Sequence, residues 1–420
     1  MNPWQKSLEF VSISDIGLQR TNNQDSHQEV PAPTQKIWNR RGHIFVVADG
    51  MGAHAAGELA SKLATDLIPN AYMKKTTLTP GDSLREAIQE ANRMIHTKGN
   101  ADEELRGMGT TCDALVLLPE GALIGHVGDS RVYRLRNSRW EQLTFDHSVV
   151  WEMQAQGLVP DANVQKNIIT RGLGVIPEVE IDLEGPWPCQ PGDIFLLCSD
   201  GLSGQFEDRE AEMGKILSIL PLREATQAMV DIANLRGGPD NITVTTVKYL
   251  GPQQAVGKYA EENPVPVATR TQLDAMPLPN WVWNIVVAAG VVFLLSLPLT
   301  FQQYGCGLPM LLVSSLLLMA FFLYLHLRKA PPAFTNHRLG RGPYRQYDAR
   351  CDVPFLKTIQ SLYAELRESV REQSSLRWSE IDAHEKRAKK ACSEKRLVEA
   401  TREYLLAISS IWRQLSGNEK

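Results

Sequence analysis

The chain has 420 residues, of which 43% are hydrophobic, 22% charged and 7% aromatic, and this composition excludes a disordered or fibrous protein. Its formal charge of −4 is unevenly spread: residues 328–420 carry 19 Lys and Arg against 12 Asp and Glu, which leaves 25 against 36 for residues 1–327. This asymmetry argues against a nucleic-acid-binding protein and is typical of an acidic catalytic part followed by a basic segment beside a membrane.

Residues 1–250 alternate short β-rich runs with helical stretches. We expect strands at 10–14, 43–48, 114–118, 122–127, 131–136, 193–198 and 242–249, and helices at 55–74, 82–97, 148–156, 208–217 and 222–235. Several strands follow one another directly with Gly at the turns, which indicates an antiparallel meander. The pattern predicts an α+β domain over residues 1–250, with a central antiparallel β-sandwich flanked by helix pairs.

Four aspartates end or follow predicted strands, each beside Gly or Asn: Asp49, Asp129, Asp200 and Asp240. One such residue is commonly only a turn, because Asp-Gly is a frequent turn pair. Four of them predict carboxylates that converge at the sheet edges, and carboxylates are the ligands that Mg²⁺ and Mn²⁺ prefer. The Gly-rich stretch 49–58 matches neither GxxxxGK[ST] nor GxGxxG, which argues against a nucleotide site.

A linker and two uncharged apolar runs follow this domain. Residues 251–280 contain five Pro and no sustained periodicity, which is typical of a linker. The runs 281–299 and 308–327 have 19 and 20 residues, so each helix would be long enough to cross the hydrocarbon layer. The short uncharged connection 300–307 predicts a two-helix transmembrane hairpin.

The basic segment 328–352 follows the second run, and the positive-inside rule places such a juxtamembrane segment in the cytoplasm. We therefore predict a two-pass protein of the cell (inner) membrane, in contact with lipid, with both soluble parts cytoplasmic. The N-terminus lacks the features of a signal peptide, and the six scattered cysteines contain no CxxC pair, as expected for a reducing compartment.

Residues 353–420 carry helical spacing with apolar stripes, which predicts a cytoplasmic helical region. Two amphipathic helices could pack on each other or on a second copy, so a homo-oligomer is one hypothesis. The basic run 386–396 is interpreted as a solvated helix face, with contact to acidic lipid as the alternative. This region contains no catalytic constellation.

Eight motifs between residues 8 and 249 occur in the order found in metal-dependent Ser/Thr protein phosphatases of type 2C, in their bacterial form. They are RTNNQDS (20–26), VVADGMGAHAAGELAS (46–61), GMGTT (107–111), GHVGDSRVYRL (125–135), LTFDHS (143–148), ITRGLG (169–174), GDIFLLCSDGL (192–202) and GPDNITV (238–244). The chain resembles this family over nearly all of residues 1–250. The resemblance implies the same sandwich, with two Mn²⁺ or Mg²⁺ ions in a cleft at one end.

The resemblance also implies roles for individual residues. Asp49 matches the carboxylate that bridges the two ions, and the carbonyl of Gly50 matches a ligand of one of them. Asp200 and Asp240 match ligands of the second ion. Asp25 matches the residue that holds a metal through water.

Two further roles follow from the same resemblance. Arg20 matches the arginine that binds the substrate phosphate, a role that suits a planar fork of N–H donors. Asp129, together with Asp200, matches a weaker third metal site. Eukaryotic relatives carry His two residues after the bridging aspartate, where this chain has Met51, so the acid that protonates the leaving group is unassigned.

The implied activity is hydrolysis of phosphoserine and phosphothreonine in proteins by a metal-bridged hydroxide, opposing Ser/Thr kinases and acting on them and their substrates. Two alternatives stay open. One is a pseudophosphatase that binds phosphoproteins as a scaffold without turnover. The other is a phosphatase specialised for anti-sigma-antagonist proteins.

Overall fold

The computed structural model describes residues 7–52, 56–160, 164, 168–207, 209–251, 315, 342–373 and 376–417. Apart from Gly251 and Ser315, the predicted linker, both apolar runs and their connection lie outside these residues, so the hairpin stays a prediction. No helix within the described ranges is long and apolar enough to cross a membrane. Residues 1–265 and 338–420 form one compact unit, which holds every described strand, and residues 266–337 form a second.

The first sheet contains strands from both ends of the chain. Its order is β1 (Leu8–Asp15), β11 (Ile242–Tyr249), β10 (Ile194–Cys198), β7 (Arg131–Arg136), β8 (Arg139–Gln142) and β12 (Arg345–Asp348). All of its pairs are antiparallel. The basic juxtamembrane segment predicted over residues 328–352 thus contains an edge strand, which its polar sequence RQYD did not indicate.

The second sheet is also antiparallel and carries the first metal-ligand candidates. Its order is β2 (Asp25–Val30), β3 (His43–Met51), β5 (Cys112–Leu118), β6 (Gly121–Val127) and β9 (Asp182–Trp187), with the short β4 (Gly109–Thr110) paired to β3. In β3, Phe45 and Val47 face the first sheet, whereas Ile44 and Val46 pack on helices. This alternation, with both faces buried, fixes the register of the strand at the centre of a sandwich.

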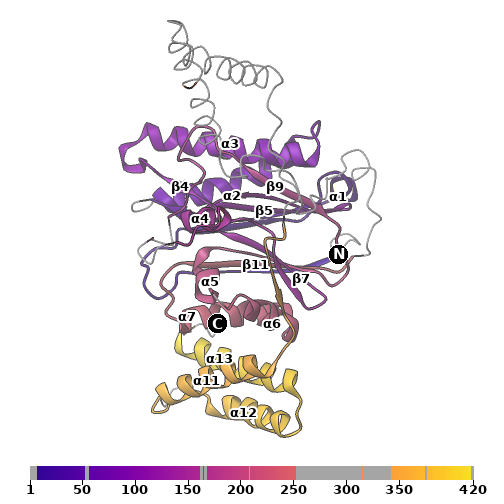
Figure 1. Cartoon of the computed structure of the whole chain (residues 1–420), viewed down its shortest axis with the longest axis vertical. Helices are drawn as coiled ribbons and strands as arrows, with labels where there is room; N and C mark the ends of the chain where they lie inside the picture. Colours follow the sequence, from indigo (N-terminus) through magenta and orange to yellow (C-terminus); the bar gives the residue numbers. More distant parts are fainter. Residues whose placement is uncertain are drawn as a thin grey trace, which may run out of the picture. The chain divides into compact units, whose positions relative to one another are not determined.

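Helices cover the outer faces of both sheets (Figure 1). The second sheet carries α2 (Ala56–Lys74) and α3 (Pro80–Ala101), and the first carries α6 (Ala211–Ile219) and α7 (Leu222–Leu235). Shorter helices are α1 (Gln35–Arg41), α4 (Val149–Ala155), α5 (Asp200–Ser203) and the 3₁₀ turns Glu103–Leu105 and Gly204–Phe206. The predicted antiparallel sandwich with flanking helices is confirmed.

Three C-terminal helices share one hydrophobic core with α6, α7 and the first sheet. They are α11 (Val353–Ser369), α12 (Trp378–Ser393) and α13 (Leu397–Leu415), where the sequence predicted two (Figure 1). Of these, α13 packs on α6 and α7, and the other two pack on α13. Most residues of the predicted stripes are buried in this core, including Ile359 of α11 and Ile408 of α13, whereas Val398 is 53% exposed. They therefore pack within the chain and need no second copy to cover them.

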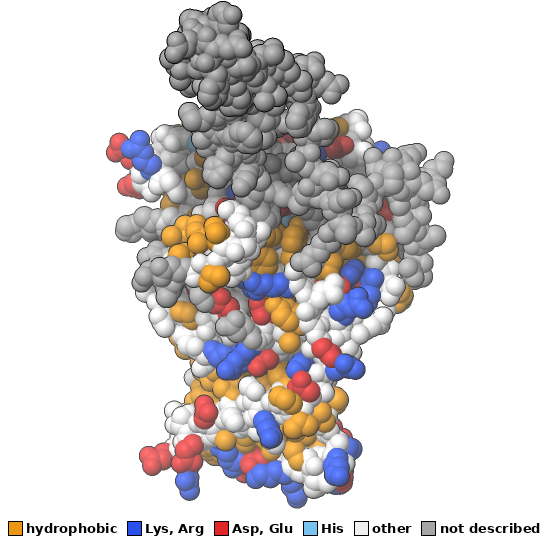
Figure 2. Space-filling view, in the orientation of Figure 1, with side chains coloured by type: hydrophobic (Ala, Val, Ile, Leu, Met, Phe, Trp, Pro, Cys, Tyr) orange, Lys and Arg blue, Asp and Glu red, His pale blue; other side chains and the backbone are white. Residues whose placement is uncertain are grey.

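The basic run 386–396 lies mostly on the outer side of α12. Ala388 and Ala391 face the core, whereas Lys386, Lys389 and Lys390 are exposed. Figure 2 shows acidic and basic side chains interspersed over this end of the molecule. Lys389, for example, pairs with Glu385 one turn away. The exposure agrees with a solvated helix face.

Candidate metal and phosphate site

The predicted carboxylates lie at the ends of strands from both sheets. Asp25 begins β2 and sits directly opposite Asp49 of β3 in the antiparallel register. Asp129 follows β6, Asp200 begins α5 two residues after the end of β10, and Asp240 precedes β11. The sandwich therefore brings five carboxylates from distant parts of the sequence to one edge.

Burial and mutual repulsion disfavour the charged form of these groups. Burial, followed by the charges of Asp25 and Asp200, raises the pKa of Asp49 well above its usual value. Burial is also the main cause that raises the pKa of Asp25 to about 7 and that of Asp129 to about 8. The pKa of Asp200 is raised by burial and then by Asp240. A divalent cation among these groups would reverse this penalty.

A set of close backbone contacts holds the Asp200 and Asp240 loops together. A Cβ on Gly201 would lie 1.9 Å from the carbonyl oxygen of Asn241, so only glycine fits between α5 and this loop. The Asn241 side chain accepts from the Gln24 amide at 2.8 Å and donates to the carbonyl of Asn22 at 3.0 Å. Asn241 thus joins the Asp240 loop to the segment that leads into Asp25.

Two residues with hydroxyl groups form hydrogen bonds to Asp25 and Asp49. Ser199 Oγ donates to Asp25 Oδ2 at 2.7 Å, which connects β10 of one sheet to β2 of the other. The Thr111 hydroxyl accepts from the Asp49 amide at 2.9 Å, and the Thr111 amide donates to the Asp49 carbonyl at 2.8 Å. Sequence reasoning assigned no role to Ser199, Thr111 or Asn241, although all three lie inside the quoted motifs.

Arg20 lies at the rim of the carboxylate cluster. Its Nη2 donates to Asp240 Oδ2 at 2.7 Å, and its side chain is 49% exposed. A guanidinium in this position can reach the cluster and the solvent at once. The predicted phosphate-binding residue therefore lies beside a predicted metal ligand.

The donor set fits hard divalent cations. Asp25 Oδ1 and Asp200 Oδ1 are buried oxygens with no hydrogen-bond partner, which is costly unless a cation binds them. Gly50 packs directly on Gly57, because a Cβ on Gly50 would lie 2.1 Å from the Gly57 carbonyl oxygen. Among the described residues, no three His, Cys, Asp or Glu side chains are already arranged to hold one ion. The fold thus gathers the carboxylates at one edge of the sandwich, although the described side chains do not surround a single point.

A cavity of about 150 Å³ adjoins the cluster. Asp129 and Asp200 line it together with Trp151 of α4. Arg345 of β12 also lines it, which sequence reasoning missed because this residue was assigned to a juxtamembrane segment.

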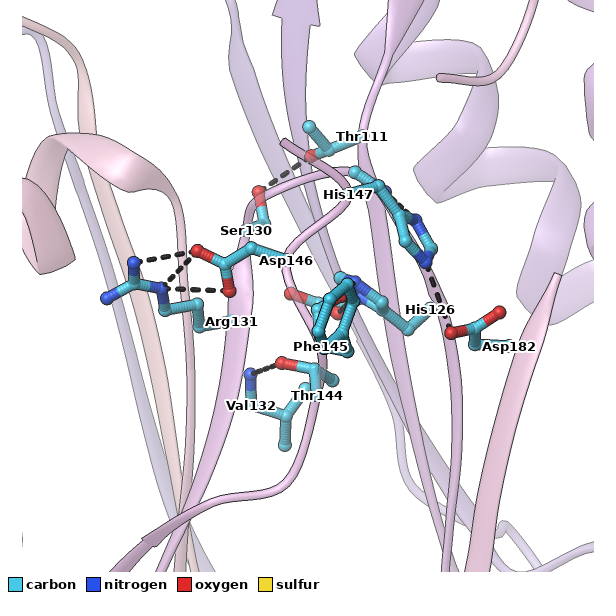
Figure 3. Close-up of polar contacts among 12 residues, drawn as sticks. Thr111, His126, Ser130, Arg131, Val132, Thr144, Phe145, Asp146, His147 and Asp182 are labelled. Atoms are coloured by element: carbon cyan, nitrogen blue, oxygen red, sulfur yellow. Dashed lines mark hydrogen bonds and ion pairs between the residues drawn. The ribbon is translucent and has the colours of Figure 1, made fainter. Parts of the chain in front are cut away.

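Figure 3 shows a polar network that includes Arg131 and Asp146, two residues that line the cavity. His126 forms hydrogen bonds with Asp113 at 2.6 Å and with the Phe145 carbonyl at 2.8 Å. Burial disfavours the charged imidazolium, but the Asp113 carboxylate outweighs this effect and raises the pKa of His126 to about 9. Burial lowers the pKa of His147 to about 3. Its Nδ1 accepts from the Gly128 amide at 3.0 Å, so its Nε2 carries the proton toward Asp182. The network joins β5, β6 and β9 beneath the Asp129 turn.

Known proteins resemble the chain over this part of the sequence. Protein phosphatase PhpP of Streptococcus pneumoniae is 37% identical over 249 residues, covering 57% of this chain and 97% of PhpP. Serine/threonine phosphatase stp of Listeria innocua is 41% identical over 214 residues, covering 49% of this chain and 84% of stp. The solved structure of the S. agalactiae serine/threonine phosphatase is 32% identical with a TM-score of 0.50, covering 58% of this chain and 100% of that one.

The sequence model of one family matches the chain over residues 19–235, which is more than half of its length, and it is described as Protein phosphatase 2C. Phosphatases of this family use Mn²⁺ or Mg²⁺, in agreement with the carboxylate donor set. The matched residues include all of the predicted site residues from Arg20 to Asp200, and Asp240 lies five residues after the end of the match. The chain belongs to the protein phosphatase 2C family.

Proposed function

We propose that the chain hydrolyses phosphoserine and phosphothreonine in proteins with Mn²⁺ or Mg²⁺ bound among its clustered carboxylates. The observation that carries this proposal is the pair of unpartnered buried oxygens of Asp25 and Asp200, within a cluster whose charges repel one another. When bound, the ions supply positive charge to the phosphate and activate water. Asp49, Asp200, Asp240 and the carbonyl of Gly50 would hold them, with Asp25 holding one through water.

Two further residues of the chain complete the proposed site. A guanidinium has five N–H donors, so Arg20 can keep its bond to Asp240 while it binds the phosphate oxygens. Asp129 adjoins Asp200 in the cavity and would contribute to a third, weaker cation position.

The direct test uses the full-length chain in detergent with a phosphothreonine peptide, after EDTA treatment and again after Mn²⁺ is added. We expect the wild-type chain to turn over the peptide only when the metal is present, and to bind Mn²⁺ in a calorimetric titration. Asp49→Asn should weaken both Mn²⁺ binding and turnover. Asp66→Asn, which changes an exposed carboxylate on α2, is the matched control. Turnover that survives EDTA would contradict the proposal, and Mn²⁺ binding without turnover would favour the scaffold alternative.

We further propose that the enzyme opposes Ser/Thr kinases at the inner membrane, where it acts on the kinases and their substrates. Two uncharged apolar runs separated by residues 300–307 support a lipid-embedded hairpin with both soluble parts in the cytoplasm. Alkaline phosphatase fused at Gln303 should be active, whereas fusions at Leu250 and Lys420 should be inactive. Activity at Lys420 would mean a single span and would contradict the two-pass topology.

A further inference from the structure

The segment that begins at residue 342 is built into the phosphatase sandwich. Its strand β12 pairs with β8, so that Arg345 lies opposite Gln142. Before the strand, the Gly342 amide donates to Glu184 Oε2 at 3.1 Å, and Tyr344 Oη donates to Glu184 Oε1 at 2.6 Å. Because Glu184 belongs to β9 of the second sheet, this short segment contacts both sheets of the sandwich.

Arg345 connects the segment to α4. Its guanidinium lies over the Trp151 ring, 4.1 Å from the centroid, and its Nη1 pairs with Glu210 Oε1 at 2.9 Å. Glu210 is also 3.8 Å from Arg131, which in turn pairs with Asp146 at 2.7 Å. Arg345 therefore stacks on an aromatic ring and completes a charge network that extends to β7.

The helix α4 packs on the rest of the domain through Trp151. It has seven residues, and Trp151 is the one side chain that it buries. The ring packs edge-on against Phe145 at 5.2 Å, while the guanidiniums of Arg131 and Arg345 lie over it. A one-turn to two-turn helix has little stability of its own, so these tertiary contacts set its position.

The position of α4 matters because it forms a wall of the cavity beside the carboxylates. Val150, Trp151 and Gln154 line this cavity together with Asp129 and Asp200. A peptide whose phosphorylated residue reaches the carboxylates would pass along this wall, whereas a small aryl phosphate would contact it much less. A shift of α4 should therefore affect peptide substrates more than small ones.

We propose that Arg345 is a positioning residue that sets the peptide-binding wall of the active site through Trp151. The segment 342–352 thereby completes the catalytic unit from outside residues 19–235, the part that matches the family. Arg345 acts through α4 and not by binding the phosphate, since Glu210 neutralises its charge and Trp151 covers one face. The inference rests on the proposed phosphatase function.

The test compares two substrates on the full-length chain with Mn²⁺: a phosphothreonine peptide and p-nitrophenyl phosphate. Arg345→Ala should raise KM for the peptide and lower its kcat/KM by about tenfold, at least fivefold more than for p-nitrophenyl phosphate. Hydrogen exchange of residues 149–155 should accelerate in the same variant. Arg345→Lys keeps the charge beside Glu210 but loses the planar stack, and should show a smaller loss in the same direction.

Arg350→Ala is the matched control, because Arg350 lies in the same segment, is 77% exposed in its side chain and pairs with Asp348. This variant should have wild-type kinetics with both substrates and wild-type hydrogen exchange in α4. Equal losses for the two substrates in Arg345→Ala, or unchanged exchange in α4, would overturn the inference. An inactive wild-type chain would instead overturn the proposed function, so the two failures are distinguishable.

Discussion

Residues 19–235 and residues 342–417 pack around the same sheet but carry different information. The first region holds four of the five clustered aspartates and matches a family along its length. The second has no catalytic motif, yet it adds the edge strand β12 and three helices to the core around α6 and α7. Chemistry and structural support are therefore encoded separately: aspartates near strand ends supply the chemistry, whereas apolar stripes and Arg345 supply the support.

The largest expected effect is the loss of catalysis when a predicted metal ligand of the first region is replaced. Asp200→Asn should lower kcat by about three orders of magnitude, equivalent to roughly 4 kcal/mol of transition-state stabilisation, because a neutral amide is a poor ligand for a hard dication. In EDTA the variant should be at least as heat-stable as the wild type, since one of several repelling carboxylates is removed. Phosphatase kinetics and thermal melts test both statements. Kinetics within twofold of wild type would reject the ligand assignment.

The second prediction concerns the contribution of the second region to the stability of the fold. Ile408 of α13 is 1% exposed in the core shared with the first sheet. Ile408→Ala should lower the free energy of unfolding by about 2–4 kcal/mol through lost burial and a residual cavity, while kcat of the folded protein changes little. Val398→Ala, at a 53% exposed position of the same helix, is the control. Denaturant unfolding followed through the phosphatase domain gives the result, and equal stability of both variants would contradict the shared core.

The third prediction concerns the binding of the substrate phosphate by Arg20 in the first region. Arg20→Ala should lower kcat/KM by about 10- to 100-fold, mainly through KM, because charge-assisted hydrogen bonds to phosphate are worth roughly 1.5–3 kcal/mol. Stability should change by less than ~0.5 kcal/mol, since the ion pair with Asp240 is about half exposed. Steady-state kinetics with p-nitrophenyl phosphate measures the loss. A drop confined to kcat would instead mean that Arg20 acts only in the transition state.

The smallest expected effect is a pH dependence at the junction of α7 and α13. Burial raises the pKa of Asp231 from 3.8 to about 6, and Ser409 and Arg413 of α13 oppose this shift. The folded state thus binds the proton more tightly, so stability falls as pH rises from about 4 to 6 and the penalty persists above. Asp231→Asn should be about 1–2 kcal/mol more stable than wild type at pH 7.5 and nearly equal at pH 4. If the difference in stability between the variant and the wild type does not change with pH, it arises from packing and not from titration of Asp231.

Much of the site could be predicted from the sequence because its signals are local. An apolar run that leads into Asp-Gly predicts both a strand and a carboxylate near its end. Asp49 lies two residues before the end of β3, and Asp200 begins α5 two residues after the end of β10. The missed strands are β2, β4, β8, β9 and β12. In β2 and β12 the sequences DSHQEV and RQYD lack apolar alternation, and their pairing depends on partners elsewhere in the sheet.

The rest depended on tertiary contacts that no local pattern contains. Arg345 lies in a basic segment after the apolar runs, where charge composition suggested a membrane surface. Only the pairing of β12 with β8 places it over Trp151. The boundary at residue 250 follows composition, whereas the shared hydrophobic core joins residues on both sides of the linker.

We expect residues 19–235 and 342–417 to unfold as one unit, because they share a hydrophobic core beside the carboxylate site. Native-state hydrogen exchange of the full-length chain in increasing denaturant measures this most directly. We predict that the amides of α11 and α13 lose protection together with those of β7 and β10, with one common free energy of opening. Loss of protection in α11–α13 at lower denaturant, while β7 and β10 stay protected, would contradict it.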